Sequence, residues 1–230
     1  MKSTLFILLL AGLILSACGG APAATSLSAV TPTAGETAAT QAATQPAGPT
    51  AETGAAGPVT FKIIPGESRA SYEVGETFLN QDNRFNLAIG VTTAVNGEVY
   101  ADLANPPAST LGEISIDISQ LTSDSSRRDN AIRGDWLESS RFPMAVFEPS
   151  GIESLPARYV EGQEYAFRVT GDLTVKETTR PVTFDVTAAL WGDTLTGKAT
   201  TTILLSQFGV GPISILSVLK TEDEAKITLE

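Results

Sequence analysis

Two runs of alternating apolar and polar residues between Tyr165 and Leu190 constrain the fold of this chain more than any other feature. The apolar positions are Tyr165, Phe167, Val169, Leu173 and Val175 in the first run, and Val182, Phe184, Val186, Ala188 and Leu190 in the second. Alternation with a period of two is typical of a strand with one buried face. The polar segment Lys176–Pro181 between the runs predicts the loop of a β-hairpin.

The same alternation recurs through residues 58–230, which we interpret as one domain. Further strands are expected over 59–64, 68–78, 85–91, 97–103, 111–118, 144–147, 195–205 and 225–229. Leu79–Asn86 is expected as a polar loop, and Asn96-Gly97 predicts a hairpin between 85–91 and 97–103. Over 125–139 the apolar spacing becomes helical. The residues therefore predict an all-β fold, an antiparallel barrel or sandwich with a short helical insertion.

Residues 1–18 have the features of an export signal. Lys2 precedes an apolar run from Leu5 to Leu15, and Leu-Ser-Ala-Cys follows, ending at Cys18. A run of about eleven residues is too short to span a bilayer, which needs roughly 20. The ending resembles the lipobox of bacterial lipoproteins, whose cysteine is acylated and begins the mature chain. The alternative is an ordinary secretory signal with an unrelated or structural cysteine.

Residues 19–57 are rich in Ala, Thr, Pro and Gly and contain hardly any large apolar residue. Such a segment cannot bury enough surface to offset its ordering entropy, so we expect a disordered tether. Its typical end-to-end span is roughly 35 Å. An acylated Cys18 and this tether would hold the domain at a membrane facing the periplasm or the cell exterior.

The composition excludes several function classes. The chain has no histidine, and Cys18 is its only cysteine. Ser-His-Asp and Cys-His catalysis and histidine metal sites are therefore absent, and we expect no enzymatic activity and no metal. The formal net charge of −11 opposes binding to nucleic acid and electrostatic docking on anionic lipid.

The charged residues have two interpretations each. Most carboxylates fall on polar strand faces or in the helical insertion, where a solvated face is the alternative to a glycosidase or calcium site. Arg127, Arg128 and Asp129 either form a structural ion-pair network or contact a ligand head group. Trp136 and Trp191 are expected as packing or rim residues rather than stacking platforms.

Several motifs together resemble the YceI-like family. They are Arg128-Asp129 ahead of the segment Trp136–Pro143, Gly171–Val175 followed by Thr179–Phe184, and the corner Ser206–Gly209. The resemblance covers Val59 to Glu230 and implies an antiparallel, eight-stranded lipocalin-like barrel. It also implies an isoprenoid quinone or polyprenyl-type lipid as the ligand. The sequence departs from the family pattern at Ala131, where histidine is frequent, at Ser206-Gln207, where a charged pair is more usual, and over Leu79–Val95.

The candidate ligand-binding residues are apolar positions expected to face the barrel interior or to lie in the unusually apolar segment Val210–Leu219. They are Tyr72, Ile116, Phe147, Phe167, Leu173, Phe184, Val186, Phe208, Ile213 and Ile215. Val210–Leu219 either forms a flap over the barrel mouth or is a buried edge strand or plug. An eight-stranded barrel either fills with side chains or holds one slender ligand. The small inward residues Gly171, Ala188, Gly197 and Ala199 fit both alternatives.

Two functions remain open at this point. The first is a lipid-anchored, extracytoplasmic protein that holds or carries an apolar, isoprenoid-type ligand, with no cofactor apart from that lipid. The second is a barrel with a filled core that acts as a non-enzymatic envelope interaction or stress module. A continuous apolar cavity of several hundred Å³ would favour the first. The sequence leaves the oligomeric state open, a dimer included.

Overall fold

The computed structural model describes residues 57–230, so the predictions for the signal, for Cys18 and for residues 19–56 lie outside the described residues. The strands are β1 Val59–Lys62, β2 Ala70–Phe78, β3 Arg84–Thr92, β4 Val95–Asn96, β5 Glu98–Ala101, β6 Thr110–Leu111, β7 Ile114–Asp117, β8 Met144–Glu153, β9 Tyr165–Val175, β10 Thr178–Trp191, β11 Thr194–Leu204, β12 Ser214–Ile215 and β13 Leu219–Leu229. The one α-helix of this region is α1, Ser126–Ala131.

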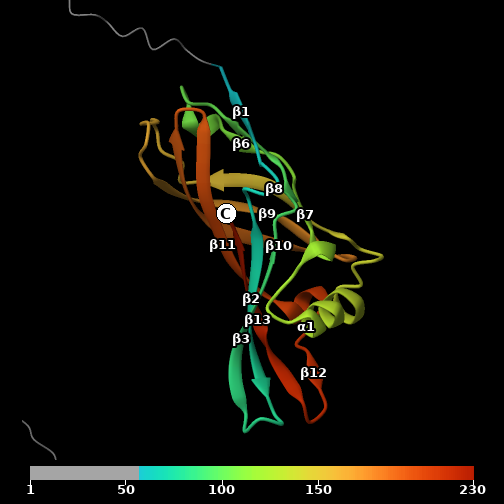
Figure 1. Cartoon of the computed structure of the whole chain (residues 1–230). Coiled ribbons are helices and arrows are strands. Elements are labelled where there is room, and N and C mark those ends of the chain that lie inside the picture. The colour runs from blue at the N-terminus through green and yellow to red at the C-terminus, as the bar shows by residue number, and fades with distance from the viewer. Residues whose placement is uncertain (1–56) are drawn as a thin grey trace, which may run out of the picture. The chain divides into compact units, whose positions relative to one another are not determined.

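The strands form two antiparallel sheets (Figure 1). The larger has ten strands in the order β3-β2-β13-β11-β10-β9-β8-β7-β4, with β12 beside β13, and the smaller has the order β1-β5-β6. The larger sheet curls into a half-barrel, which confirms the predicted all-β, antiparallel class. Within residues 57–230 no ladder joins β3 to β4, so the hydrogen-bonded sheet is open rather than closed.

The hairpin from Tyr165 to Leu190 is confirmed as β9 and β10. Val186 pairs with Phe167, and Phe184 pairs with Val169. The predicted loop Lys176–Pro181 was too long, because β10 already begins at Thr178. Lys176 adopts a φ of 56°, and this left-handed conformation lets two residues complete the turn.

The prediction of a hairpin at Asn96-Gly97 is wrong. β3 pairs with β2, whereas β5 pairs with β1 and β6. Gly97 allows a close approach instead of a turn: a Cβ there would lie 2.3 Å from Cδ1 of Ile114. The predicted polar loop Leu79–Asn86 is also shorter, because β3 begins at Arg84.

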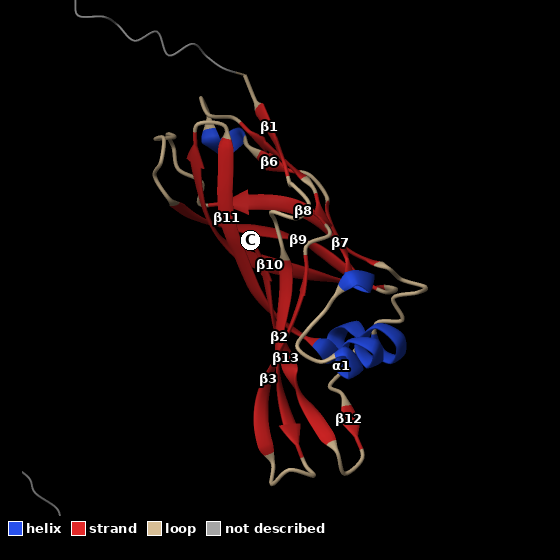
Figure 2. Cartoon of the chain, in the orientation of Figure 1, coloured by secondary structure: helices blue, strands red, loops and turns tan. Residues whose placement is uncertain are grey.

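The helical insertion is confirmed and lies beside β2 and β13, where the sheet is narrow (Figure 2). The Ser125 side chain accepts a hydrogen bond from the backbone N–H of Arg128 and so caps α1. A π-helical turn, Ile132–Trp136, continues α1. No helix within residues 57–230 combines the length and apolar character of a membrane span.

The hydrophobic core lies on the inner face of the curled sheet. The rings of Phe147 on β8 and Phe184 on β10 pack edge to face, with centroids 5.0 Å apart. Strands β2 and β13 run on past this core and carry β3 and β12 (Figure 1).

Candidate ligand-binding cavity

A cavity of about 750 Å³ opens between the inner face of the larger sheet and the smaller sheet. Its apolar lining from the larger sheet is Val95, Ile114, Ile116, Phe147, Ile152, Phe167, Val169, Leu173, Phe184, Val186, Ala188, Ala189, Leu190, Leu195, Ala199, Ile227 and Leu229. Its lining from β1, β5, β6 and the adjoining loops includes Phe61, Ile63, Ile64, Val99, Ala101, Leu103 and Leu111. This volume is within the range of about 300–1,000 Å³ typical of small-molecule sites.

Alternation explains the lining on most strands of the larger sheet, although the consecutive residues Thr194–Ala199 of β11 all line the cavity. On β10 the even-numbered residues from Phe184 to Leu190 line the cavity, because successive side chains of a strand point to opposite faces, and Ala189 joins them near the end of the strand. The small inward residues serve two purposes. A Cβ at Gly171 would lie 2.7 Å from Cζ of Phe147, so this glycine accommodates a large neighbour. Ala188 and Ala199 instead border the cavity and leave its space open.

The mouth of the cavity carries charged residues that are bonded to one another. The side chain of Glu230 accepts hydrogen bonds from Nε of Arg69 and from Nζ of Lys198, each at 2.7 Å. These bonds, from Lys198 first and Arg69 second, lower the pKa of the Glu230 carboxyl. Lys62 pairs with Glu98 at 3.1 Å. Arg69 and Lys198 therefore share one carboxylate. The lining as a whole holds three cations, Lys62, Arg69 and Lys198, against four carboxylates, Glu67, Asp102, Asp193 and Glu230.

Six of the ten candidate ligand-binding residues line this cavity: Ile116, Phe147, Phe167, Leu173, Phe184 and Val186. The other four, Tyr72, Phe208, Ile213 and Ile215, are not in its lining. Phe208 is buried in the core, in a 3₁₀ turn after β11. Ile213 is half-buried and Ile215 is exposed on β12. Val210–Leu219 thus contributes no lining residue, and the strand that lies wholly within it, β12, is exposed rather than buried.

Tyr72 lies on β2, outside the cavity and near α1. A Cβ at Gly90 would lie 2.2 Å from Cε1 of Tyr72, so the ring packs over that glycine. Burial raises the pKa of the Tyr72 phenol to about 12, and the Arg128 guanidinium opposes this rise. Arg128 itself pairs with Glu76 and Asp124, and neither it nor Asp129 lines the cavity. The contacts of Arg128 are therefore those of the structural ion-pair alternative.

Sequence reasoning missed the wall formed by β1, β5 and β6. Phe61 and Ile63 alternate with polar positions, so a signal for a one-sided strand was present. Their role in the cavity was not predictable, because alternation within β1 does not show that β1 faces the larger sheet. The residues between β8 and β9 were missed too, and Leu155, Pro156 and Tyr159 complete the lining there.

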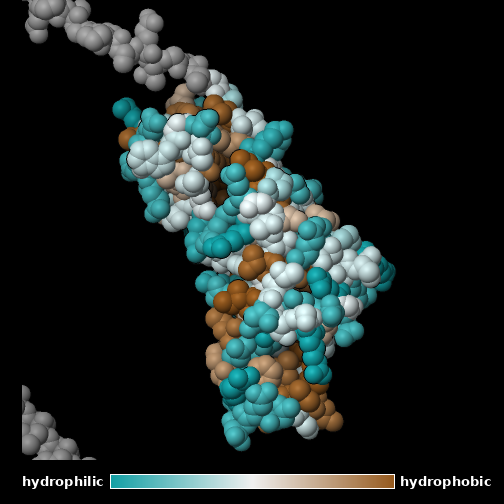
Figure 3. Space-filling view, viewed as in Figure 1, coloured by the Kyte–Doolittle hydropathy of each residue, from teal (hydrophilic) through white to brown (hydrophobic). Residues whose placement is uncertain are grey.

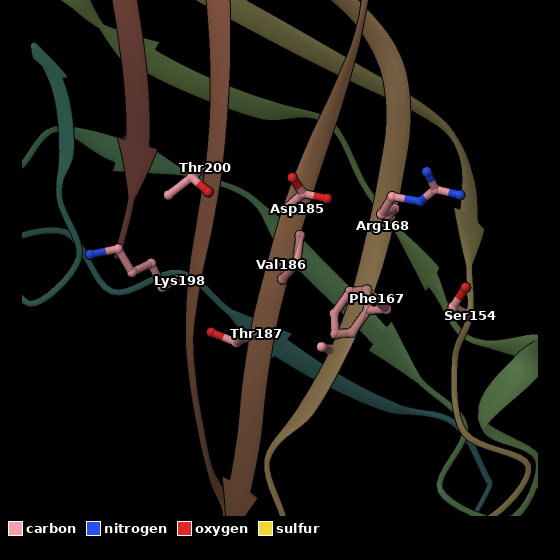
Figure 4. Close-up of a pocket in the computed structure, with 9 residues that line it drawn as sticks. Ser154, Phe167, Arg168, Asp185, Val186, Thr187, Lys198 and Thr200 are labelled. Carbon is pink, nitrogen blue, oxygen red and sulfur yellow. The ribbon is translucent and has the colours of Figure 1, made fainter. Parts of the chain in front are cut away.

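A second, shallower depression of about 390 Å³ lies across β9, β10 and β11 (Figure 4). Figure 4 shows Arg168 and Lys198 extending away from each other, with Phe167 and Val186 between them. Arg168 is paired with Glu153 at 2.8 Å, and Lys198 is paired with Glu230. Exposed, paired charges are typical of a solvated sheet face, so the larger apolar cavity is the better ligand site. In the described region no group of three potential metal-ligating side chains comes together.

Comparison with known proteins identifies the fold family. The YceI-like domain model matches residues 61–230. The chain belongs to the YceI-like family. Its curated relatives include UPF0312 proteins of Pseudomonas putida strains GB-1 and W619. Each is 35% identical to this chain over 138 residues, which cover 56% of this chain and 67% of the relative.

Two solved structures share the fold of this YceI-like domain. BcnA of Burkholderia cenocepacia has a TM-score of 0.57 and 23% identity, covering 73% of this chain and 96% of BcnA. A polyisoprenoid binding domain from Saccharophagus degradans, implicated in plant cell wall breakdown, has a TM-score of 0.50 and 8% identity, covering 70% of this chain and 90% of that domain. At these identities the likeness shows a common fold alone.

Proposed function

We propose that this YceI-like protein holds an apolar, isoprenoid-type lipid in its cavity and acts as a binding or carrier protein without catalysis. The observation that carries the proposal is the cavity of about 750 Å³ with its apolar inner lining. Each 100 Å² of ligand surface buried there would contribute about 2.5 kcal/mol to binding. A polyisoprenoid binding domain of the same fold in Saccharophagus degradans supports this ligand class.

The mouth favours a neutral head group. A phosphate would need a free cation or a set of backbone donors. Lys62 is bonded to Glu98, Arg69 and Lys198 share Glu230, and the carboxylates of the lining outnumber its cations. A quinone or an alcohol needs only hydrogen bonds at the polar mouth. Among isoprenoid lipids, we therefore propose quinone-like or polyprenol-like ligands ahead of polyprenyl phosphates.

The proposed location is outside the cytoplasm, at a membrane. The Leu-Ser-Ala-Cys ending supports acylation at Cys18, and residues 19–57 have the composition of a tether. A ligand that is nearly insoluble in water is best delivered from and to a bilayer, so an anchored carrier suits the cavity.

The experiment that tests the function pairs ligand identification with a cavity-filling variant. Native mass spectrometry of the full chain after mild extraction is expected to detect a co-purifying isoprenoid lipid. Ala188→Trp places an indole inside the cavity and is expected to weaken binding of a long-chain isoprenoid quinone by about tenfold or more, which is about 1.4 kcal/mol. The matched control is Thr183→Trp, because Thr183 is exposed on the other face of the same strand.

The outcomes separate the two hypotheses. Loss of quinone binding in Ala188→Trp alone supports the cavity as the site. Equal quinone binding by Ala188→Trp and Thr183→Trp would contradict the proposal that the protein is a lipid carrier. Repeated preparations without any co-purifying lipid would contradict it too, and either result would favour the envelope interaction module.

A further inference from the structure

The outermost strand of the larger sheet leaves three large apolar side chains in solvent. Phe85, Leu87 and Ile89 alternate along β3 and are 61%, 48% and 44% exposed. Figure 3 shows apolar surface along the lower left edge, where Figure 1 places β3. Single exposed apolar residues are ordinary, but a row of three on one strand marks an interaction surface.

The same edge carries unpaired backbone groups. The N–H of Val91 donates to the carbonyl of Thr122 at 2.8 Å, and the carbonyl of Val91 accepts from the N–H of Thr122 at 2.9 Å. The backbone groups of Val91 therefore point away from β2. The register of β3 with β2 is unbroken, and backbone direction alternates with a period of two. The N–H and C=O groups of Phe85, Leu87 and Ile89 consequently point to the same open edge.

This edge lacks the usual protection against pairing. Natural sheet edges are short, charged, interrupted by proline or covered by another element. The opposite end of this sheet is β4, which has only two residues. From Arg84 to Gly90, β3 contains no proline and a single charged residue, Arg84. No strand within residues 57–230 pairs with that side of the segment.

We propose that a second copy of this chain covers β3, by antiparallel pairing of the two β3 strands about a two-fold axis at Leu87. Leu87 then faces Leu87 of the second copy, and Phe85 faces Ile89 on both sides of the axis. The pairing ends at the turn before Arg84 in one direction and at Thr122 in the other, so this register uses the whole free edge. The interface is isologous, as a two-fold dimer requires.

Charge and size agree with this occupant. Two chains of net charge −11 repel each other over most of their surfaces, but Arg84–Gly90 brings no carboxylate to the contact. Residues 19–57 are a poorer occupant, because they contain hardly any large apolar side chain. One strand per copy buries less than the roughly 800 Å² per partner of a standard interface, so the dimer is reversible and concentration-dependent.

The first test is sedimentation of the full chain over a wide concentration range. Leu87→Lys places two like charges opposite each other at the axis, and Leu87→Pro removes an N–H that β2 does not use. Each is expected to weaken dimerisation by tenfold or more, with circular dichroism reporting that the fold is kept. The control is Leu216→Lys, which changes a 90% exposed apolar residue away from β3.

The second test fixes the register. In a Cys18→Ser background, chains carrying Phe85→Cys and chains carrying Ile89→Cys are mixed and oxidised. The proposed pairing gives a disulfide between the two kinds of chain, because directly opposed residues have Cα atoms about 5.5 Å apart, within disulfide reach. Phe85→Cys alone is expected to cross-link far less.

The proposal is overturned by a monomer at all concentrations, by a dimer that both Leu87 variants leave intact, or by a dimer that Leu216→Lys abolishes. Protection of β3 only in the presence of neutral phosphatidylcholine vesicles would overturn it as well, in favour of a lipid surface.

Discussion

The guanidinium of Arg128 donates two hydrogen bonds to the carboxylate of Glu76, from Nε to Oε1 and from Nη2 to Oε2, each at 2.9 Å. The side chains are only 12% and 5% exposed, and they join the helical insertion to β2. The hydrogen bonds to Glu76, and next the one to Asp124, hold the pKa of the Arg128 guanidinium above its usual range, although burial opposes the rise. A buried bidentate pair of this kind fixes where α1 lies on the sheet.

Removing one partner of this pair is expected to be costly. Arg128→Ala leaves Glu76 buried without a countercharge and should lower the free energy of unfolding by about 3–5 kcal/mol. Glu76→Ala leaves Arg128 paired with Asp124 and should lower it by less. Glu76→Leu with Arg128→Met removes both charges and should cost much less than the sum of the single changes. Urea unfolding of the full set measures this; strictly additive effects would show that the pair is not coupled.

Acid should weaken the fold through Asp117. Burial alone raises the pKa of this carboxyl, but hydrogen bonds from Ser119 and Gln120 outweigh it and hold the pKa below its usual range. A group whose folded pKa is depressed stabilises the protein above its unfolded pKa and loses that contribution as pH falls through the folded value. The stabilisation from Asp117 is therefore complete above about pH 5 and disappears in stronger acid.

Asp117→Asn is expected to lower the Tm at neutral pH and to flatten its fall in acid. Thermal melts from about pH 7 to about pH 2 check this, with Asp172→Asn on the exposed face of β9 as the control. If the two variants have parallel pH profiles, Asp117 does not contribute in this way.

The cavity mouth should set head-group preference through Glu230. Glu230→Gln keeps the shape of this side chain but frees Arg69 and Lys198 from a carboxylate. We expect several-fold tighter binding of a polyprenyl phosphate and unchanged binding of the matching polyprenol. Glu153→Gln, which frees Arg168 on the outer face, is the control. Equal changes for both lipids would show that the mouth does not contact the head group.

Membrane attachment should depend on Cys18. Cys18→Ser removes the thiol that acylation requires and is expected to move the exported chain from the membrane fraction to the soluble fraction. Fractionation and metabolic labelling with a fatty acid check this. Unchanged labelling would place the acyl group elsewhere.

The predictable parts of this fold are those that depend on a single strand. Alternation located β9 and β10 and placed Phe167, Phe184 and Val186 on the inner face. In a strand with one buried face, the apolar residues of its own sequence show which side chains point inward. Pairing was harder. Asn96-Gly97 has the composition of a turn, yet Gly97 is required by the packing of Ile114, a contact that only the tertiary structure reveals.

The apolar segment Val210–Leu219 was the harder case for the site. Its hydrophobicity suggested a flap or a plug, but β12 pairs only with β13 and stays exposed. The hydrophobicity of a segment indicates that it packs against some other surface, but it does not identify that surface. The exposed residues Phe85, Leu87 and Ile89 of β3 pose the same problem. An alternating apolar pattern cannot distinguish a strand face that packs in the core from one that binds a partner.

The walls of the cavity belong to two different hydrogen-bonded sheets, and this bears on how a ligand enters. The seam between the smaller sheet and the half-barrel can part without breaking any ladder of the ten-stranded sheet. β1 and β6 each pair along one side only, so their amide protons should exchange with deuterium before those of β9 and β10. Entry of a ligand would then require only a local opening at β1, while the curled sheet keeps the shape that selects the ligand.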